Sequence, residues 1–198
     1  MGERLQTLRS FSRILLAIIV LCLGTAPLIS TSLQNLATDL EGKPFDPLRV
    51  ARGKVVVLIF VRTDCPISNR YAPLVQQLST QYADKAAFFL VYPSKKETAD
   101  AIRKHDREFG YTLAALRDPQ HILVKQSQAQ ITPEAAVFDA NRRLVYHGRI
   151  DNLYEDFGHA RKGATTHELA DAIEAASAGQ TLSRNATPAV GCYISDLE

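Results

Sequence analysis

The chain has 198 residues, enough for one domain with a buried core and for little beyond it. Hydrophobic residues make up 46% and charged residues 22%, which argues against a disordered chain and against a polytopic membrane protein. The 23 Lys and Arg nearly balance the 21 Asp and Glu, so no broad positive field invites a nucleic acid. We therefore expect a single folded domain with no nucleic-acid partner.

The N-terminus has the order of an export signal. Three arginines within the first 13 residues precede an unbroken apolar run over residues 14–23. This run is short for a membrane span, but residues 14–29 together would be a possible membrane anchor. We expect residues 1–30 to be a signal peptide cleaved near Ser30, or an uncleaved N-terminal anchor. Either way, the sequence predicts a periplasmic or otherwise extracytoplasmic protein.

A buried strand and a helix are expected on either side of Cys65. Residues 33–52 suit an irregular or short-stranded lead-in, and residues 54–61, KVVVLIFV, are typical of a strand buried on both faces. A polar turn over residues 62–65 follows, Pro66 occupies a favourable first helical position, and apolar residues then recur at helical spacing. Cys65 is therefore expected at or beside a helix N-cap.

The remaining elements continue an alternation of strands and helices. They are a buried strand at 86–92, an amphipathic helix at about 97–109, a helical piece at 122–126, strands at 135–138 and 144–146 joined by a turn at 139–141, and a helix at 166–176. This order predicts an α/β fold with a central mixed β-sheet flanked by helices, the thioredoxin-like arrangement. The domain is expected over residues 31–180, followed by a tail over residues 181–198.

The cysteine count is informative once export is assumed. Removal of a signal peptide removes Cys22 and leaves Cys65 and Cys192, in a compartment where disulfides persist. From the count alone, a static bridge that ties the tail to the domain is the simpler interpretation.

The local sequence around Cys65 favours chemistry instead. A cysteine at a helix N-terminus faces unpaired backbone N–H groups, which lower its pKa and increase its thiolate fraction. Ser68 stands where a C-x-x-C motif would have its second cysteine. Its hydroxyl is able to hydrogen-bond a thiolate but forms no disulfide, so Cys65 needs a partner from elsewhere in the chain.

Several segments together resemble a known family. They are FVRTDCPISNRYAPLVQQL, FFLVYP, ALRDP, ITPEAAVFD, LVYHGRID and the terminal AVGCYI. From about residue 35 onwards, the chain resembles bacterial redoxin-domain proteins of the thioredoxin-like superfamily. These proteins are relatives of the AhpC/TSA peroxiredoxins and of TlpA-like thiol oxidoreductases.

The resemblance implies roles for particular residues. It puts Cys65 at the nucleophilic site and Thr132-Pro133 at a cis-proline corner that faces it. The Thr132 backbone would then lie beside the sulfur, where an extended substrate is able to pair with it. Cys192, on a mobile tail, is the candidate to attack oxidised Cys65 and form a bridge that a separate thiol reductant opens.

Two departures from the family patterns limit what the resemblance implies. Typical peroxiredoxins have a Thr or Ser three residues before the cysteine, whereas Thr63 lies two before Cys65. TlpA-like reductases keep both cysteines of the motif, whereas Ser68 replaces one here. We expect an extracytoplasmic oxidoreductase that acts on protein disulfides or peroxides and needs no cofactor, with Thr63, Ser68, Thr132 and Pro133 around its two cysteines.

A non-catalytic function is the alternative. The fold would then present its Thr132-Pro133 edge to a partner around a structural bridge, or Cys65 and Cys192 with a nearby histidine would hold Cu(I). Most histidines lie in polar stretches of sequence, which predicts positions on the surface rather than a role in the site. They are His105, His121, His159 and His167.

Overall fold

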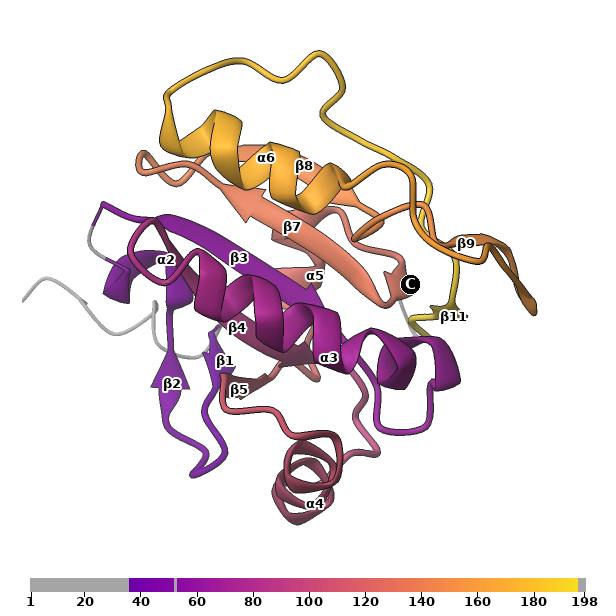
Figure 1. Cartoon of the computed structure of the whole chain (residues 1–198). Helices are drawn as coiled ribbons and strands as arrows, with labels where there is room; N and C mark the ends of the chain where they lie inside the picture. Colours follow the sequence, from indigo (N-terminus) through magenta and orange to yellow (C-terminus); the bar gives the residue numbers. More distant parts are fainter. Residues whose placement is uncertain (1–35, 52, 196–198) are drawn as a thin grey trace, which may run out of the picture. The chain divides into compact units, whose positions relative to one another are not determined.

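The structure is a computed structural model that describes residues 36–51 and 53–195 (Figure 1). The expected signal peptide or anchor, residues 1–30, lies outside the described residues. Within the described part, no helix combines the length and the apolar character that a membrane span needs.

Seven strands of the described part form one mixed sheet in the order β2-β1-β5-β4-β3-β7-β8. Three strands run parallel to one another: β3 (Val55–Phe60), β4 (Ala86–Tyr92) and β5 (Ala114–Arg117). Two pairs of antiparallel strands extend them, β7 (Glu134–Phe138) with β8 (Leu144–Gly148), and β1 (Ala37–Thr38) with β2 (Pro44–Phe45). The mixed sheet predicted from the sequence is confirmed.

Helices cover both faces of this sheet (Figure 1). Alternate residues of β3 point into two apolar clusters, as the period of a strand requires. One cluster includes side chains of α3 (Pro66–Gln81), α4 (Ala99–Phe109) and α6 (Glu168–Ser177), and the other includes side chains of α2 (Pro47–Val50) and α5 (Ile122–Ser127). Every residue of β3 is buried, which explains the continuous apolar run in its sequence.

Within the seven-stranded sheet, the sequence did not predict β5, and two histidines lie elsewhere than expected. β5 has the sequence AALR, with little β-propensity of its own, and is fixed by its pairing with β4 and β1. The prediction of surface positions for His105 and His121 is wrong, because each is 4% exposed. Both rings make hydrogen bonds inside the fold, which compensates for their burial. His159 and His167 are exposed, as predicted.

The segment after α6 is attached to the domain at two places. Backbone hydrogen bonds tie it first to β8, where the amide of His147 donates to the carbonyl oxygen of Asn185 (3.0 Å) and the amide of Thr187 donates to that of His147 (3.2 Å). Further on, β11 (Cys192–Tyr193) pairs in antiparallel fashion with β6 (Ile131–Thr132). The expected mobile tail is thus docked on the domain.

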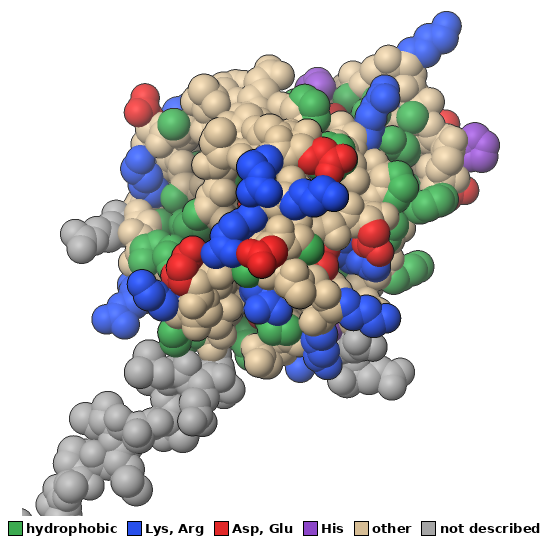
Figure 2. Space-filling model, turned by 90° about the horizontal axis from the view of Figure 1, so that it is seen from below, with side chains coloured by type: hydrophobic (Ala, Val, Ile, Leu, Met, Phe, Trp, Pro, Cys, Tyr) green, Lys and Arg blue, Asp and Glu red, His purple; other side chains and the backbone are tan. Residues whose placement is uncertain are grey.

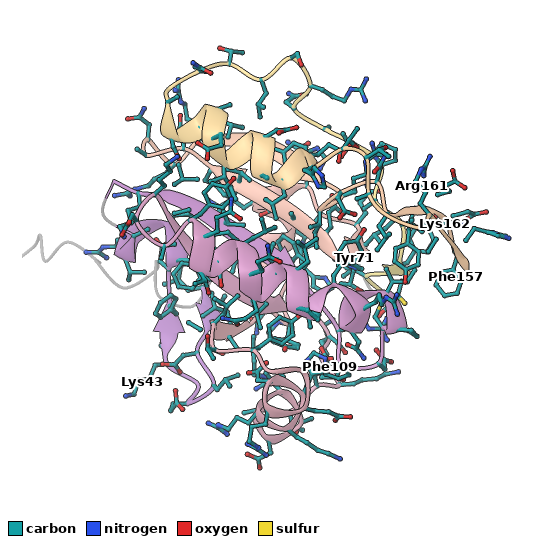
Figure 3. All side chains as sticks on the ribbon, in the orientation of Figure 1. Lys43, Tyr71, Phe109, Phe157, Arg161 and Lys162 are labelled. Carbon is teal, nitrogen blue, oxygen red and sulfur yellow. The ribbon has the colours of Figure 1, made fainter. Side chains whose placement is uncertain are left out.

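The surface has no single dominant sign of charge on the face shown in Figure 2, where basic and acidic side chains are interspersed. On another side, a short ribbon of β9 (Tyr154–Asp156) and β10 (His159–Ala160) extends from the domain. Phe157 is exposed in this ribbon and lies near Arg161 and Lys162 (Figure 3). The mixture of basic and acidic side chains on the face in Figure 2 is consistent with the near balance of charge in the sequence.

Candidate active site

Cys65 is the N-cap of α3, as the sequence predicts. It follows the strand β3 and the turn over residues 62–64, and Pro66 begins the helix. Its backbone is extended (φ −91°, ψ 108°), and its carbonyl oxygen accepts the amide of Asn69 at 3.1 Å. Its side chain makes no capping bond to the helix. The sulfur is therefore free to interact across the site, close to the positive end of the helix dipole.

The cis-proline corner faces this sulfur. The Thr132–Pro133 peptide bond is cis, and the thiol of Cys65 donates a hydrogen bond to the carbonyl oxygen of Thr132 at 3.0 Å. Glu134 shapes the corner, since its carboxylate accepts the amides of Gln130 (2.9 Å) and Ile131 (3.1 Å). The placement of Thr132 and Pro133 opposite Cys65 agrees with the sequence analysis.

The second cysteine reaches the same place from the C-terminal segment. In the pairing of β11 with β6, Cys192 is the partner of Thr132, and the Thr132 hydroxyl donates to the carbonyl oxygen of Cys192 at 3.3 Å. The two cysteines are close enough for each to shift the pKa of the other, and both are free thiols. Two sulfurs from distant parts of the chain therefore meet at the start of α3.

Ionisation of the two thiols is strongly unequal. Burial opposes ionisation of Cys65, but hydrogen bonding from Cys192, from Ser68 and from the Thr132 side chain outweighs it and lowers the pKa of Cys65 below its ordinary value. Burial and the hydrogen bond with Cys65 raise the pKa of Cys192 to about 12. Cys65 is thus the thiol of the pair that ionises first, and it gives up its hydrogen bond to the Thr132 carbonyl oxygen when it does so, while Cys192 keeps its proton.

The two cysteines also differ in access. Cys65 is 0% exposed, whereas Cys192 is partly buried. Cys65 is buried although the turn before it is polar, because Thr132 and Cys192, both distant in sequence, lie against the sulfur.

Ser68 and Thr63 have different places in the site. Ser68 is fully buried, its hydroxyl has no nitrogen or oxygen partner among the described residues, and both its hydroxyl and its amide lower the pKa of Cys65. Thr63 acts through its backbone: its amide donates to Glu97 Oε1 at 2.7 Å, and its carbonyl oxygen accepts Asn69 Nδ2 at 3.2 Å. No hydrogen bond joins the Thr63 hydroxyl to the sulfur in the described structure.

A buried polar network behind the 62–64 turn was missed from the sequence. Asn69 Oδ1 lies 2.8 Å from His105 Nε2, and the other nitrogen of this ring lies 2.9 Å from the hydroxyl of Tyr92. Glu97 is buried as well, which raises the pKa of its carboxyl group. Helical periodicity alone assigns Glu97 and His105 to a charged surface, so no sequence signal distinguishes them.

The contacts of the C-terminal strand were also missed. Arg62 Nη1 donates to the carbonyl oxygen of Tyr193 at 3.3 Å, and Ile194 is 5% exposed within an apolar cluster. Gly191 packs so closely on β6 that an added Cβ would overlap the carbonyl oxygen of Thr132. The sequence signal that could have indicated docking is the small residue directly before Cys192, Gly191, together with the apolar residue two places after it, Ile194.

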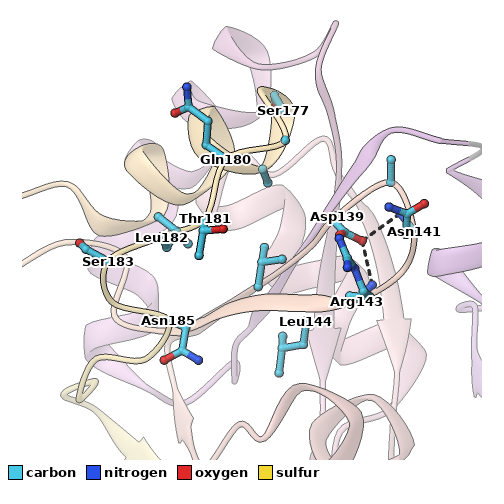
Figure 4. A pocket seen from close by; sticks show the side chains of 14 residues that line it. Asp139, Asn141, Arg143, Leu144, Ser177, Gln180, Thr181, Leu182, Ser183 and Asn185 are labelled. Carbon is cyan, nitrogen blue, oxygen red and sulfur yellow. Dashed lines mark hydrogen bonds and ion pairs between the residues drawn. The ribbon is translucent and has the colours of Figure 1, made fainter.

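Other possible sites are less informative. Among residues 36–51 and 53–195, no group of three or more His, Cys, Asp or Glu side chains is placed to hold a metal ion. A hollow of about 750 Å³ lies between the β7–β8 turn, the end of α6 and the tail (Figure 4). None of the described residues that line it is a cysteine or a histidine. Its clearest polar contact joins Asp139 to Arg143 and serves the turn.

Comparisons with known proteins agree with this fold. Two solved structures resemble the chain over 80% of its length: an uncharacterized conserved protein from Geobacillus kaustophilus (TM-score 0.69, 21% identity, 86% of that chain) and a hypothetical protein from Sinorhizobium meliloti (0.65, 22%, 88%). A secreted Mycobacterium tuberculosis disulfide oxidoreductase homologous to Escherichia coli DsbE is similar over 72% of this chain and 96% of its own (0.51, 20%).

The search of curated proteins found no match. The solved structures establish the thioredoxin-like fold. A family match covers residues 24–161, more than half of the sequence, and carries the description Redoxin. The chain therefore belongs to the Redoxin family.

Proposed function

We propose that the protein is a thiol–disulfide oxidoreductase in which Cys65 and Cys192 are the redox pair. The observation that carries this proposal is that both free cysteines meet Thr132: the Cys65 sulfur bonds to its carbonyl oxygen, and Cys192 is its partner in the pairing of β11 with β6. The opposite shifts of their pKa values support the assignment of roles, with Cys65 as nucleophile and Cys192 as resolving thiol. The disulfide oxidoreductase among the similar structures is in keeping with this chemistry.

The reaction has two exchange steps. The Cys65 thiolate attacks a disulfide of the substrate, a bond forms between Cys65 and one substrate sulfur, and the other substrate sulfur leaves as a thiolate. Cys192 then gives its proton to a departing thiolate and attacks Cys65, which releases the second substrate sulfur. The substrate disulfide is reduced to two thiols, Cys65 and Cys192 become linked, and an external dithiol returns them to the reduced form.

The geometry favours a protein disulfide over a peroxide as the oxidant. Thr132 offers its backbone to a paired strand directly beside the sulfur, which suits a polypeptide substrate. Thr63 makes only backbone contacts in the described structure, so it adds nothing that would polarise a peroxide. A peroxide remains the alternative oxidant in the test below.

The proposed location is outside the cytoplasm. The arginines and the apolar run of residues 14–23 have the order of an export signal. The similar Mycobacterium tuberculosis oxidoreductase is a secreted protein. In such a compartment, an oxidised Cys65–Cys192 pair would persist until a dedicated reductant meets it.

Turnover tests the proposal directly. The purified protein is given a model protein disulfide and a dithiol reductant, and, in a parallel assay, hydrogen peroxide and the same reductant. We expect turnover of the disulfide by the wild type, none by Cys65→Ser, and a trapped mixed disulfide on Cys65 in Cys192→Ser. Turnover of peroxide alone would assign the alternative oxidant. Equal activity of Cys65→Ser and the wild type would contradict the proposal.

A Cu(I)-binding function is separated from this one by titration. Two adjacent thiols suit a soft cation. Stoichiometric Cu(I) binding by the reduced protein that is lost in Cys65→Ser, together with no turnover of disulfides, would assign the two cysteines to copper instead.

A further inference from the structure

We propose that residues 190–194 of the protein's own tail imitate a substrate segment: they occupy the Ile131–Thr132 edge, where a polypeptide substrate would pair, and exclude it from Cys65 until they leave. The inference rests on the proposed function, because the occupied edge lies beside the Cys65 sulfur. It adds a substrate class: segments with a small residue just before the cysteine and an apolar residue two places after it.

The backbone of the tail is bound as an added strand. Cys192 pairs with Thr132 and Tyr193 pairs with Ile131, and the amide of Ile194 donates to the carbonyl oxygen of Gln130 at 2.9 Å. In the described structure, β6 has β11 as its sheet partner. Removal of the tail would therefore leave an open edge, and addition of a strand to such an edge is a common way to bind a peptide.

The side chains of the tail alternate as those of a bound peptide would. Cys192 points to Cys65, Tyr193 is 75% exposed, and Ile194 is buried in the apolar cluster. Backbone hydrogen bonds give such an interaction its affinity, and the pockets for alternate side chains give it selectivity. The cysteine and the residue two places after it are the ones that meet the domain.

Gly191 shows why the residue before the substrate cysteine must be small. An added Cβ there would overlap the carbonyl oxygen and the carbonyl carbon of Thr132, and a side-chain carbon of Ile131 is the third neighbour. Close packing, rather than an unusual backbone angle, therefore requires glycine at this position. A substrate strand in the same register meets the same restriction before its own cysteine.

The tail and a substrate strand exclude each other. With the tail docked, the Cys65 side chain is 0% exposed, so no disulfide is able to approach it. The tail must leave before the first exchange and return for Cys192 to complete the second.

Two peptides test the substrate class. The first has the sequence of residues 189–195, Ala-Val-Gly-Cys-Tyr-Ile-Ser, with its cysteine activated as a 2-thiopyridyl disulfide, and the second has valine in place of glycine. The Cys65 thiolate attacks the peptide sulfur, the new disulfide links Cys65 to the peptide, and pyridine-2-thione leaves. The release of pyridine-2-thione gives the rate, which is normalised to the rate of each peptide with glutathione.

Two variants, both in a Cys192→Ser background, test whether the docked tail excludes a substrate strand from the edge of β6. Gly191→Val should undock the tail, and Gly163→Val is the matched control, because nothing lies within 4 Å of an added Cβ at Gly163. We expect the first peptide to react at least about tenfold faster with Gly191→Val than with Gly163→Val. We also expect it to react at least about tenfold faster than the valine peptide on the undocked variant, a factor that corresponds to about 1.4 kcal/mol.

Equal rates for the two variants would overturn the exclusion, and equal normalised rates for the two peptides would overturn the substrate class. A chain that ends at Val190 provides the same comparison if Gly191→Val does not fold. Failure of the proposed function is distinguishable, because Cys65 would then react with neither peptide nor with dipyridyl disulfide. Reaction with dipyridyl disulfide, but no effect of undocking or of the peptide sequence, would refute the inference alone.

Discussion

Cys192 lies directly opposite Thr132 in an antiparallel pair of strands, although 60 residues separate them in the sequence. This pairing brings the Cys192 thiol to the sulfur of Cys65, which itself bonds to Thr132. This backbone pairing thus covers the Cys65 sulfur and brings the Cys192 sulfur next to it, and the proposed exchange between the two depends on that arrangement.

Removal of the Cys192 thiol should make Cys65 a weaker acid. The neighbouring Cys192 side chain is the foremost of the groups that lower the pKa of Cys65. In Cys192→Ala, we expect the pKa of Cys65 to rise, as measured by the ultraviolet absorbance of the thiolate during a pH titration. Cys192→Ser is the matched control, because its hydroxyl still donates, and its effect should be smaller. An unchanged titration in Cys192→Ala would show that the helix start alone activates the thiol.

The reduced protein should lose stability in alkaline solution. The pKa of Cys192 is raised from 9.0 to about 12 in the folded protein, so between these values the folded state holds a proton that the unfolded chain has released. The free energy of unfolding therefore falls as the pH rises through this window. Denaturant titrations across the window should show a shallower fall for Cys192→Ala. Parallel curves for the two proteins would contradict the assigned shift.

Glu97 should act as a positioning residue for the turn before Cys65. Its Oε1 accepts the amide of Thr63, and its Oε2 is buried without a partner in the described structure. In Glu97→Ala, the amide of Thr63 loses its partner, which should cost about 1–3 kcal/mol in the free energy of unfolding.

Glu97→Gln keeps an acceptor for the amide of Thr63 and should retain most of this stability. The pH at which the Cys65 thiolate forms should also move in Glu97→Ala and be restored in Glu97→Gln. A loss of stability without any change in the thiolate titration would limit Glu97 to a structural role.

His105 should make the protein sensitive to acid. Burial lowers the pKa of His105 below 6.5, the value in the unfolded chain, so at acidic pH the unfolded chain binds a proton that the folded state excludes. The contribution of the neutral ring is present above this value and is lost as the pH falls through the window below it. Unfolding curves of His105→Gln should depend less on pH there. An equal dependence would place the acid sensitivity in other groups.

The apolar anchor of the tail should control access to Cys65. Ile194→Ala removes buried apolar volume, which should weaken docking by at least about 2 kcal/mol. That change corresponds to a rise of about 30-fold in the undocked population. Alkylation of Cys65, followed by mass spectrometry, should accelerate accordingly. The exposed side chain of Tyr193 provides the control, since Tyr193→Ala should leave the rate almost unchanged.

The sequence predicted the parts of the site that local pattern determines. An apolar β-branched run, a polar turn and Pro66 place Cys65 at a helix start, because each of these preferences acts over a few residues. The cis bond at Pro133 followed from the family resemblance and is present in the structure. The mixed sheet followed from the alternation of strand and helix patterns.

The sequence did not predict the parts of the fold and the site that depend on contacts between residues far apart in the chain. The strand at Cys192 is two residues long and forms through its pairing with β6. It is too short to show a periodic pattern in the sequence. His105 lies in a sequence dense with charge, yet the ring turns inward to Tyr92. Burial of Cys65 is likewise a product of segments far away in the chain.

Mapping of the disulfide formed on oxidation tests the central claim most directly. The reduced protein is treated with a substoichiometric amount of a protein disulfide, free thiols are blocked in acid, and the peptides are identified by mass spectrometry. Cys65 and Cys192 should be linked to each other within one chain, with the added disulfide converted to its dithiol. A stable adduct on Cys65 beside a free Cys192 would contradict the redox pair.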